Sequence, residues 1–213
     1  ITRGANCCGG EEDGGMTTDF KKTLDAYQAR NLEFRVIDVP AMQYLMVDGQ
    51  GDPNTSQEFT DAVAALFAVA YKLKFTSKQL GQDYVVMPLE GLWWSDDPSA
   101  FTIARDKSLW SWTLMIMVPD WISRAMFDET IAKTGRTAVR LETLDEGRCV
   151  QTLHTGSFDD EAEILARMHS EFIPSHGLTM TGKHHEIYFS DFRRTPPDKL
   201  RTILRQPVAN RTP

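Results

Sequence analysis

The sequence predicts a single-domain α+β protein that contains the same strand–helix–strand–strand unit twice. Three observations predict this fold: a repeated order of apolar segments, a capped amphipathic helix in each half, and a length of 213 residues with 41% hydrophobic residues, enough for one sizeable core. The folded domain is placed at residues 16–213, with one repeat at about 35–118 and the other at about 136–208. Residues 1–15 are rich in glycine and acidic side chains, and they predict a disordered leader.

The elements of the first repeat follow from its apolar spacing. Two short strand-like runs, at 34–40 and 43–48, are separated by Pro40. After a glycine turn, Thr55 and Glu58 have the spacing of a capping box, in which a hydroxyl and a carboxylate satisfy two free N–H groups at the start of a helix. The pattern predicts a helix at 55–75 and strands at 84–94 and 109–118. A helix at 120–133, which ends at Gly135, follows the repeat.

The second half has the same order. A strand at 148–155 ends in a glycine turn, and Ser157 and Asp160 then open a helix with one apolar face. Strands at 184–190 and 202–208 complete it. Each half also has a glutamate near the start of its third element, Glu90 in one and Glu186 in the other. We therefore predict an internal duplication, with a ligand groove where the two halves meet.

Composition and charge exclude several classes of function. The net charge of -7 disfavours a nucleic-acid surface, because neutralising phosphates requires clustered lysine and arginine. No apolar run reaches the ~18 residues of a membrane span, and no secretory signal is found, so a cytoplasmic protein without membrane contact is expected. Cys7, Cys8 and Cys149 have neither disulfide nor metal spacing, which predicts unpaired thiols. The oligomeric state is not predicted.

Four tryptophans form the first candidate site. Trp93, Trp94, Trp110 and Trp112 lie within twenty positions on two consecutive predicted strands. Trp110 and Trp112 are two residues apart, so their side chains should leave the same face of the sheet. Core packing and binding of a flat aromatic substrate have about equal weight for these residues. Strand alternation does not tell which face lines the groove.

Glu186 is the second candidate, in the segment HHEIYFS. Alternation along a strand places His184, Glu186 and Tyr188 on one face. A carboxylate among large apolar neighbours is either on a solvated edge or in a partly buried site, where it could take a proton from water or hold a cation. Tyr188 could share that water or the substrate. Glu90 is the weaker counterpart in the first repeat.

Tyr71 is the third candidate, near the end of the predicted helix at 55–75. Its hydroxyl could point toward the sheet, although core filling is favoured on local grounds. The five histidines have no HxxxH or HExxH spacing, so neither a metal nor another cofactor is expected. Serine-hydrolase, nucleotide-binding and Rossmann motifs are also missing from the sequence.

Several longer motifs together resemble a known family. They are YLMVDGQGDPN, AYKLKF, PLEGLWW, WSWTLMIMVP and HHEIYFSDFRRTPPDKLRTILRQPV, and they span about residues 20–208. The chain resembles the GyrI-like small-molecule-binding proteins, and more narrowly their stand-alone branch with PLEGLWW and HEIYxSDxRR motifs. The resemblance implies a duplicated βαββ (SHS2-like) fold of the multidrug-binding-domain type. It also implies a ligand cleft between the repeats with Glu186 in it.

The resemblance implies two kinds of function. Proteins of the stand-alone branch hydrolyse toxins that contain a cyclopropane ring, and others sense drugs or modulate gyrase inhibitors. The first hypothesis is therefore a metal-independent hydrolase that detoxifies a DNA-alkylating cyclopropane compound. Glu186 would activate water, Tyr188 or Tyr71 would orient it, and the tryptophans would stack on the toxin. The alternative is a binding protein that sequesters or senses a lipophilic cation, with Glu186 as the counter-charge.

Overall fold

The computed structural model describes residues 17–95 and 107–211, so the predicted leader at 1–15 lies outside the described residues. The strands are β1 (Arg35–Val39), β2 (Met42–Gln50), β3 (Leu89–Trp94), β4 (Ser111–Val118), β5 (Arg140–Leu144), β6 (Gly147–Thr155), β7 (Leu178–Met180), β8 (His184–Tyr188) and β9 (Arg201–Asn210). The helices are α1 (Phe20–Thr23), α2 (Gln57–Gln79), α3 (Arg124–Thr134), α4 (Glu161–Arg167) and α5 (Ile173–Ser175). Short helical turns are η1 (Asp25–Tyr27), η3 (Lys107–Leu109), η4 (Phe158–Asp160), η5 (Met168–Phe172) and η6 (Pro197–Lys199).

One large antiparallel sheet organises the molecule and confirms the α+β class. Its strand order is β1-β6-β9-β8-β3-β4-β2-β5, and β7 pairs with β9. In the segments β2-α2-β3-β4 and β6-α4-α5-β7-β8-β9 the first strand pairs with the last, but β7 has no counterpart in the first segment. The internal duplication therefore stays a prediction. The two segments meet where β3 pairs with β8.

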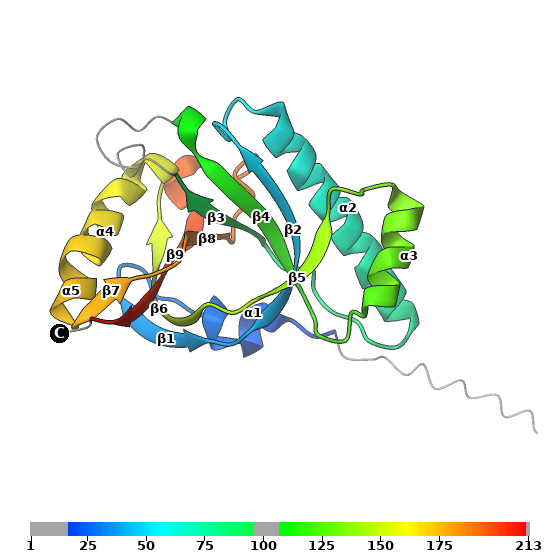
Figure 1. The fold of residues 1–213 in the computed structure, drawn as a ribbon, viewed down its shortest axis with the longest axis horizontal. Helices are drawn as coiled ribbons and strands as arrows, with labels where there is room; N and C mark the ends of the chain where they lie inside the picture. Colours follow the sequence, from blue (N-terminus) through cyan, green and yellow to red (C-terminus); the bar gives the residue numbers. More distant parts are fainter. Residues whose placement is uncertain (1–16, 96–106, 212–213) are drawn as a thin grey trace, which may run out of the picture.

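Both helical layers cover the same face of the sheet. Phe59 of α2 packs on Trp93 and Trp112, and α4, η5 and α5 bury their apolar side chains against Leu204 and its neighbours in β9 and β6. The register places Gly91 opposite Glu186 and Glu186 opposite Leu204, so these residues share that face. Figure 1 shows α2 and α3 beside the β2–β4 half, and α4 and α5 beside the β6–β9 half. We call this the helix-bearing face.

The first half differs from its prediction at element ends. The capping box expected at Thr55 and Glu58 is wrong by one residue: Ser56 is the N-cap, and its hydroxyl accepts from the N–H of Phe59 at 3.2 Å. Helix α2 also continues beyond the predicted end at residue 75. Strand β3 begins later than expected, because Tyr84 makes only an isolated bridge with Thr18.

The remaining helix ends agree with the prediction in part. Both hydrogen bonds of the capping box between Ser157 and Asp160 are present. Gly135 ends α3 in the left-handed conformation, at φ 67°, as expected for a glycine after a helix. Helix α3, however, begins at Arg124 behind the N-cap Ser123, and not at residue 120. None of the helices in the described ranges is both long and apolar enough to cross a membrane.

The opposite face of the sheet buries a network of charged side chains. His185 lies 2.9 Å from Glu90 and 3.0 Å from Glu146, and Arg205 lies 2.8 Å from Glu146. The hydroxyl of Tyr27 donates to Glu90 at 2.6 Å. Burial alone would raise the pKa of Glu146, but His185 and Arg205 lower it to about 2. Glu90, the predicted counterpart of Glu186, therefore lies in a sealed network on the other face.

Candidate functional site

A chain of hydrogen bonds marks the centre of the helix-bearing face. The hydroxyl of Tyr188 donates to Oε2 of Glu186 at 2.7 Å, and Nε1 of Trp93 donates to the hydroxyl oxygen of Tyr188 at 2.9 Å. Glu186 and Tyr188 belong to β8 and Trp93 to β3, so the chain joins the two halves of the fold. His184, Glu186 and Tyr188 lie on one face, as alternation along the strand predicts. We call Trp93, Tyr188 and Glu186 the seam triad.

The triad is partly shielded from water and still reachable. The side chain of Glu186 is 15% exposed, so its carboxylate is neither sealed in the core nor out in bulk solvent. Burial raises the pKa of Tyr188 well above its ordinary value, and the neighbouring carboxylate of Glu186 raises it further. The tyrosine hydroxyl therefore stays protonated and remains a donor to Oε2 at physiological pH. The other oxygen, Oε1, lies 3.3 Å from Nε2 of His184.

Gly91 makes room for this arrangement, and sequence analysis did not identify it. A Cβ atom at position 91 would lie 2.8 Å from Nε1 of Trp93 and 3.3 Å from the hydroxyl oxygen of Tyr188. Any side chain there would push the indole away from the tyrosine. The available signal was a glycine inside a strand, in PLEGLWW, which often indicates close approach of neighbouring groups.

The four predicted tryptophans separate into two groups. The rings of Trp93 and Trp110 meet edge to face with centroids 5.7 Å apart, and Phe59 stacks on Trp93 at 6.2 Å. Trp112 contacts the same phenylalanine but is fully buried. Trp94 leaves the opposite face, where Nζ of Lys183 lies 3.2 Å from its ring centroid. Trp93 thus belongs to the seam triad, and Trp110 borders it.

Tyr71 lies apart from the triad. Its ring is 49% exposed on α2 and contacts Phe67 and Phe75, so the expected core position for Tyr71 is wrong. Among the described residues, no hydrogen bond joins it to Glu186. A residue not considered earlier, Phe158 of η4, meets Tyr188 edge to face at 5.8 Å and borders the triad on the side of the second half.

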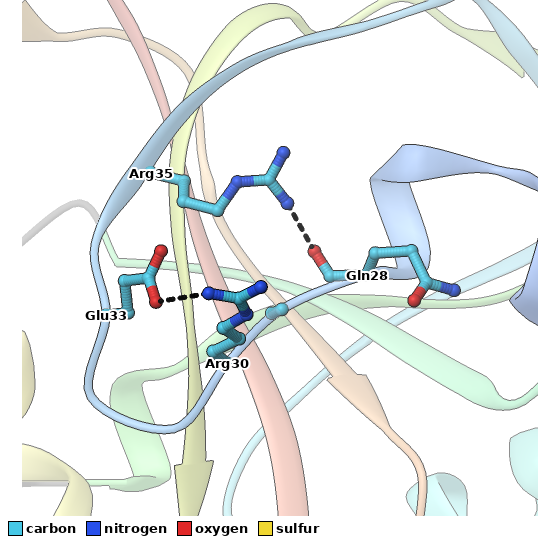
Figure 2. Close-up of a pocket in the computed structure, with 5 residues that line it drawn as sticks. Gln28, Arg30, Glu33 and Arg35 are labelled. Atoms are coloured by element: carbon cyan, nitrogen blue, oxygen red, sulfur yellow. Dashed lines mark hydrogen bonds and ion pairs between the residues drawn. The ribbon is translucent and has the colours of Figure 1, made fainter.

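A hollow of about 440 Å³ lies elsewhere, in the loop before β1, and is lined by Gln28, Ala29, Arg30, Glu33 and Arg35. Figure 2 shows how its charges are satisfied: Arg35 donates to the backbone carbonyl of Gln28 at 3.0 Å, and Arg30 lies 3.6 Å from Glu33. This hollow contains no aromatic side chain and none of the predicted site residues. The seam triad is therefore the better candidate site.

The comparisons with known proteins place this geometry in a family. The model of the GyrI-like small molecule binding domain matches residues 32–209. The chain belongs to the GyrI-like family. The observed fold and the family model together confirm the resemblance seen in the sequence motifs.

Solved structures of the GyrI-like fold give more specific relatives. An uncharacterized conserved protein from Listeria innocua is 38% identical, with a TM-score of 0.80, over 90% of this chain and 99% of its own. A hydrolase from the same organism is 36% identical, also with a TM-score of 0.80, over 91% of this chain and 100% of its own. The C-terminal domain of EcmrR, at 9% identity and a TM-score of 0.53, shares the fold alone. The search of curated proteins found no match.

Proposed function

We propose that this GyrI-like protein is a hydrolase that opens an electrophilic cyclopropane ring on a flat aromatic toxin, and so detoxifies it. The observation that carries the proposal is the seam triad, in which Tyr188 fixes one oxygen of a partly exposed carboxylate, Glu186. A carboxylate that is held in place and is still partly exposed is the arrangement that a general base needs. The Listeria innocua relatives described as hydrolases support the same reaction class.

In the proposed reaction, Glu186 takes a proton from a water molecule as the water oxygen bonds to a ring carbon of the cyclopropane. The carbon–carbon bond to the substituted ring carbon breaks, and its electron pair moves into a conjugated carbonyl, which becomes a phenolate. The phenolate then takes up a proton, and Glu186 releases its own to solvent. Ring strain lowers the intrinsic barrier, so a positioned base suffices without a cofactor.

The neighbouring residues have distinct proposed roles. Tyr188 is a positioning residue, because its hydroxyl hydrogen is already given to Glu186, and Trp93 holds that hydroxyl in place. Trp110 offers a partly exposed aromatic surface for stacking, whereas Trp93 and Trp112 are buried and Trp94 leaves the opposite face of the sheet. The exposed Tyr71 is retained as a second hydroxyl whose role can be tested separately.

Single-turnover hydrolysis of a spirocyclopropyl cyclohexadienone tests the proposal. Ring opening gives a phenol, and its ultraviolet absorbance reports the rate above the uncatalysed reaction with water. We expect Glu186→Gln to lower the rate by about 10²–10⁴-fold. The control is Glu163→Gln, on the exposed surface of α4, which should leave the rate unchanged. Equal rates for wild type and Glu186→Gln would remove Glu186 from the mechanism, and Tyr71→Phe tests Tyr71 in the same assay.

The alternative, a protein that only binds a lipophilic cation, predicts a different product analysis. A binder would return the intact compound after long incubation, and Glu186→Gln would weaken binding without changing any product. A hydrolase would return the ring-opened phenol in amounts that exceed the protein. The same samples, separated by chromatography, therefore distinguish the two functions.

A further inference from the structure

Two histidines beside the seam triad have ring nitrogens with no partner. Nδ1 and Nε2 of His184 and Nε2 of His169 are buried, and none of them hydrogen-bonds within the part of the chain that the structure describes. Nε2 of His184 lies 3.3 Å from Oε1 of Glu186 but is not aligned for a hydrogen bond. Buried polar groups without partners are costly, at about 1–3 kcal/mol each, and native folds seldom retain them without a use.

The backbone of the second half brings His169 to this position. Residues Met168–Phe172 form a turn of π-helix between α4 and α5, and His169 is the second residue of this turn. Its ring meets the ring of His184 edge to face, with centroids 6.2 Å apart. Short π-helical turns are rare and frequently occur at functional sites. The turn therefore supplies a second, independent observation that points to this pair of rings.

The two rings are suited to a neutral hydrogen-bonding group. Burial lowers the pKa of His169 to about 4, and the neighbouring His184 contributes in the same direction. A neutral imidazole has one N–H donor and one acceptor nitrogen. In the neutral form of His184 that has its hydrogen on the nitrogen nearest Oε1 of Glu186, Nδ1 is an acceptor. No donor to Nδ1 occurs among the described residues, so a bound molecule is needed to supply one.

A metal ion is a poor explanation for the pair. Across residues 17–95 and 107–211, no group of three or more histidine, cysteine, aspartate or glutamate side chains is arranged to hold a metal ion. A purely structural role is also poorly supported, because a ring that only fills space needs no ring nitrogen without a partner. The nearby His176, by contrast, forms a hydrogen bond between Nδ1 and the backbone carbonyl of Phe172 at 2.8 Å.

We propose that His184 and His169 form a recognition subsite that accepts an O–H or N–H donor on the rim of a flat aromatic ligand, next to Glu186. The inference rests on the proposed function and narrows its substrate class. The ligand is an aromatic compound with a phenol-like or indole-like donor at one edge, and a purely hydrocarbon ring system is disfavoured. The donor anchors the ring system beside Trp110 while Glu186 faces the reacting carbon.

Equilibrium dialysis with two matched probes tests this subsite. 2-Naphthol and 2-methoxynaphthalene have the same ring system and the same oxygen, but only 2-naphthol can donate a hydrogen bond. We expect wild type to bind 2-naphthol about 2- to 10-fold more tightly, the value of one net hydrogen bond. His184→Phe should abolish the preference, and His184→Asn, which keeps an acceptor, should restore part of it. The control is His176→Phe, an exposed histidine outside the subsite.

Each outcome is decisive. Equal affinity of wild type for both probes, or an equal loss of both in His184→Phe with a native circular dichroism spectrum, overturns the subsite and leaves the proposed hydrolase standing. If wild type binds neither probe, the protein does not bind flat aromatic ligands, and both the proposed function and the subsite are wrong. A preference that His184→Phe removes and His176→Phe keeps supports the inference.

Discussion

Gly91 lies directly opposite Glu186 across the pairing of β3 with β8. The residue without a side chain thus faces the proposed base, and the space above it is filled by Trp93 from one half and Tyr188 from the other. The geometry of the triad depends on this vacant Cβ position as much as on the groups that hydrogen-bond. Four predictions follow from the triad, from the charged network behind it and from the buried cysteine.

Gly91→Ala should displace Trp93. The new methyl group would lie 2.8 Å from Nε1, so the indole must move and its hydrogen bond to Tyr188 is lost. We expect the free energy of unfolding in urea to fall by about 1–3 kcal/mol and tryptophan emission to shift to longer wavelength. Gly81→Ala, where a Cβ meets nothing within 4 Å, is the control; its strain at φ 86° should cost stability without changing the emission. Unchanged emission in Gly91→Ala would contradict the prediction.

Trp93 and Tyr188 should be energetically coupled. Tyr188→Phe removes the donor to Glu186 and the acceptor for the indole N–H, and Trp93→Phe removes only the indole. A double-mutant cycle measured by urea unfolding should give a coupling energy of about 0.5–1.5 kcal/mol. Strictly additive effects would mean that the hydrogen bond between the two side chains does not contribute to stability.

The charged network should make the free energy of unfolding fall both at acidic pH and at pH values above 6.5. The pKa of Glu146 is about 2 in the folded chain against an ordinary 4.5, so its stabilisation is present above pH 4.5 and is lost as pH falls toward 2. That loss is about 3 kcal/mol. His185, held between Glu146 and Glu90, has a raised pKa, so its contribution is present below 6.5 and is lost as pH rises through the raised value.

Urea unfolding at a series of pH values measures this dependence. The free energy of unfolding should be highest between about pH 4.5 and 6.5, the interval in which both groups contribute. Glu146→Gln should weaken the dependence of the free energy of unfolding on pH below 4.5. The exposed Glu163→Gln should leave that dependence unchanged. If the free energy of unfolding of Glu146→Gln still falls as steeply below pH 4.5, other carboxylates cause the loss of stability in acid.

Cys149 should react with thiol reagents only after unfolding. It is unpaired and fully buried in β6, and burial together with the neighbouring Glu146 raises its pKa to about 12. In a chain with Cys7→Ser and Cys8→Ser, labelling by an aromatic disulfide at pH 8 should be negligible without urea and complete above the unfolding midpoint. Rapid labelling of the folded chain would show that β6 opens locally.

Local sequence rules predicted much of the second half and the face of the site. Ser157 and Asp160 gave the correct start of a helix because capping is a short-range effect. Strand alternation is also a short-range rule, and it correctly predicted that Glu186 and Tyr188 share a face of the sheet. Where two hydroxyls were adjacent, as at Thr55 and Ser56, spacing alone selected the wrong cap.

The remaining features depend on contacts between distant segments. Strand β5 has the polar sequence RLETL, and it is a strand because it pairs with β2 at the edge of the sheet. The π-helical turn that carries His169 has no marker in the sequence, and the need for Gly91 appears only when β3 and β8 are side by side. Tyr71 was misplaced because helical spacing does not tell which flank of α2 another element covers.

The partners of the charged network are far apart along the chain. The carbonyl of Ala26 accepts a hydrogen bond from Arg205, although 179 positions separate the two residues. During synthesis the network therefore cannot be completed before Arg205 has left the ribosome. Until then Glu146 lacks the guanidinium of Arg205, so we expect nascent chains that end before residue 205 to remain sensitive to proteases.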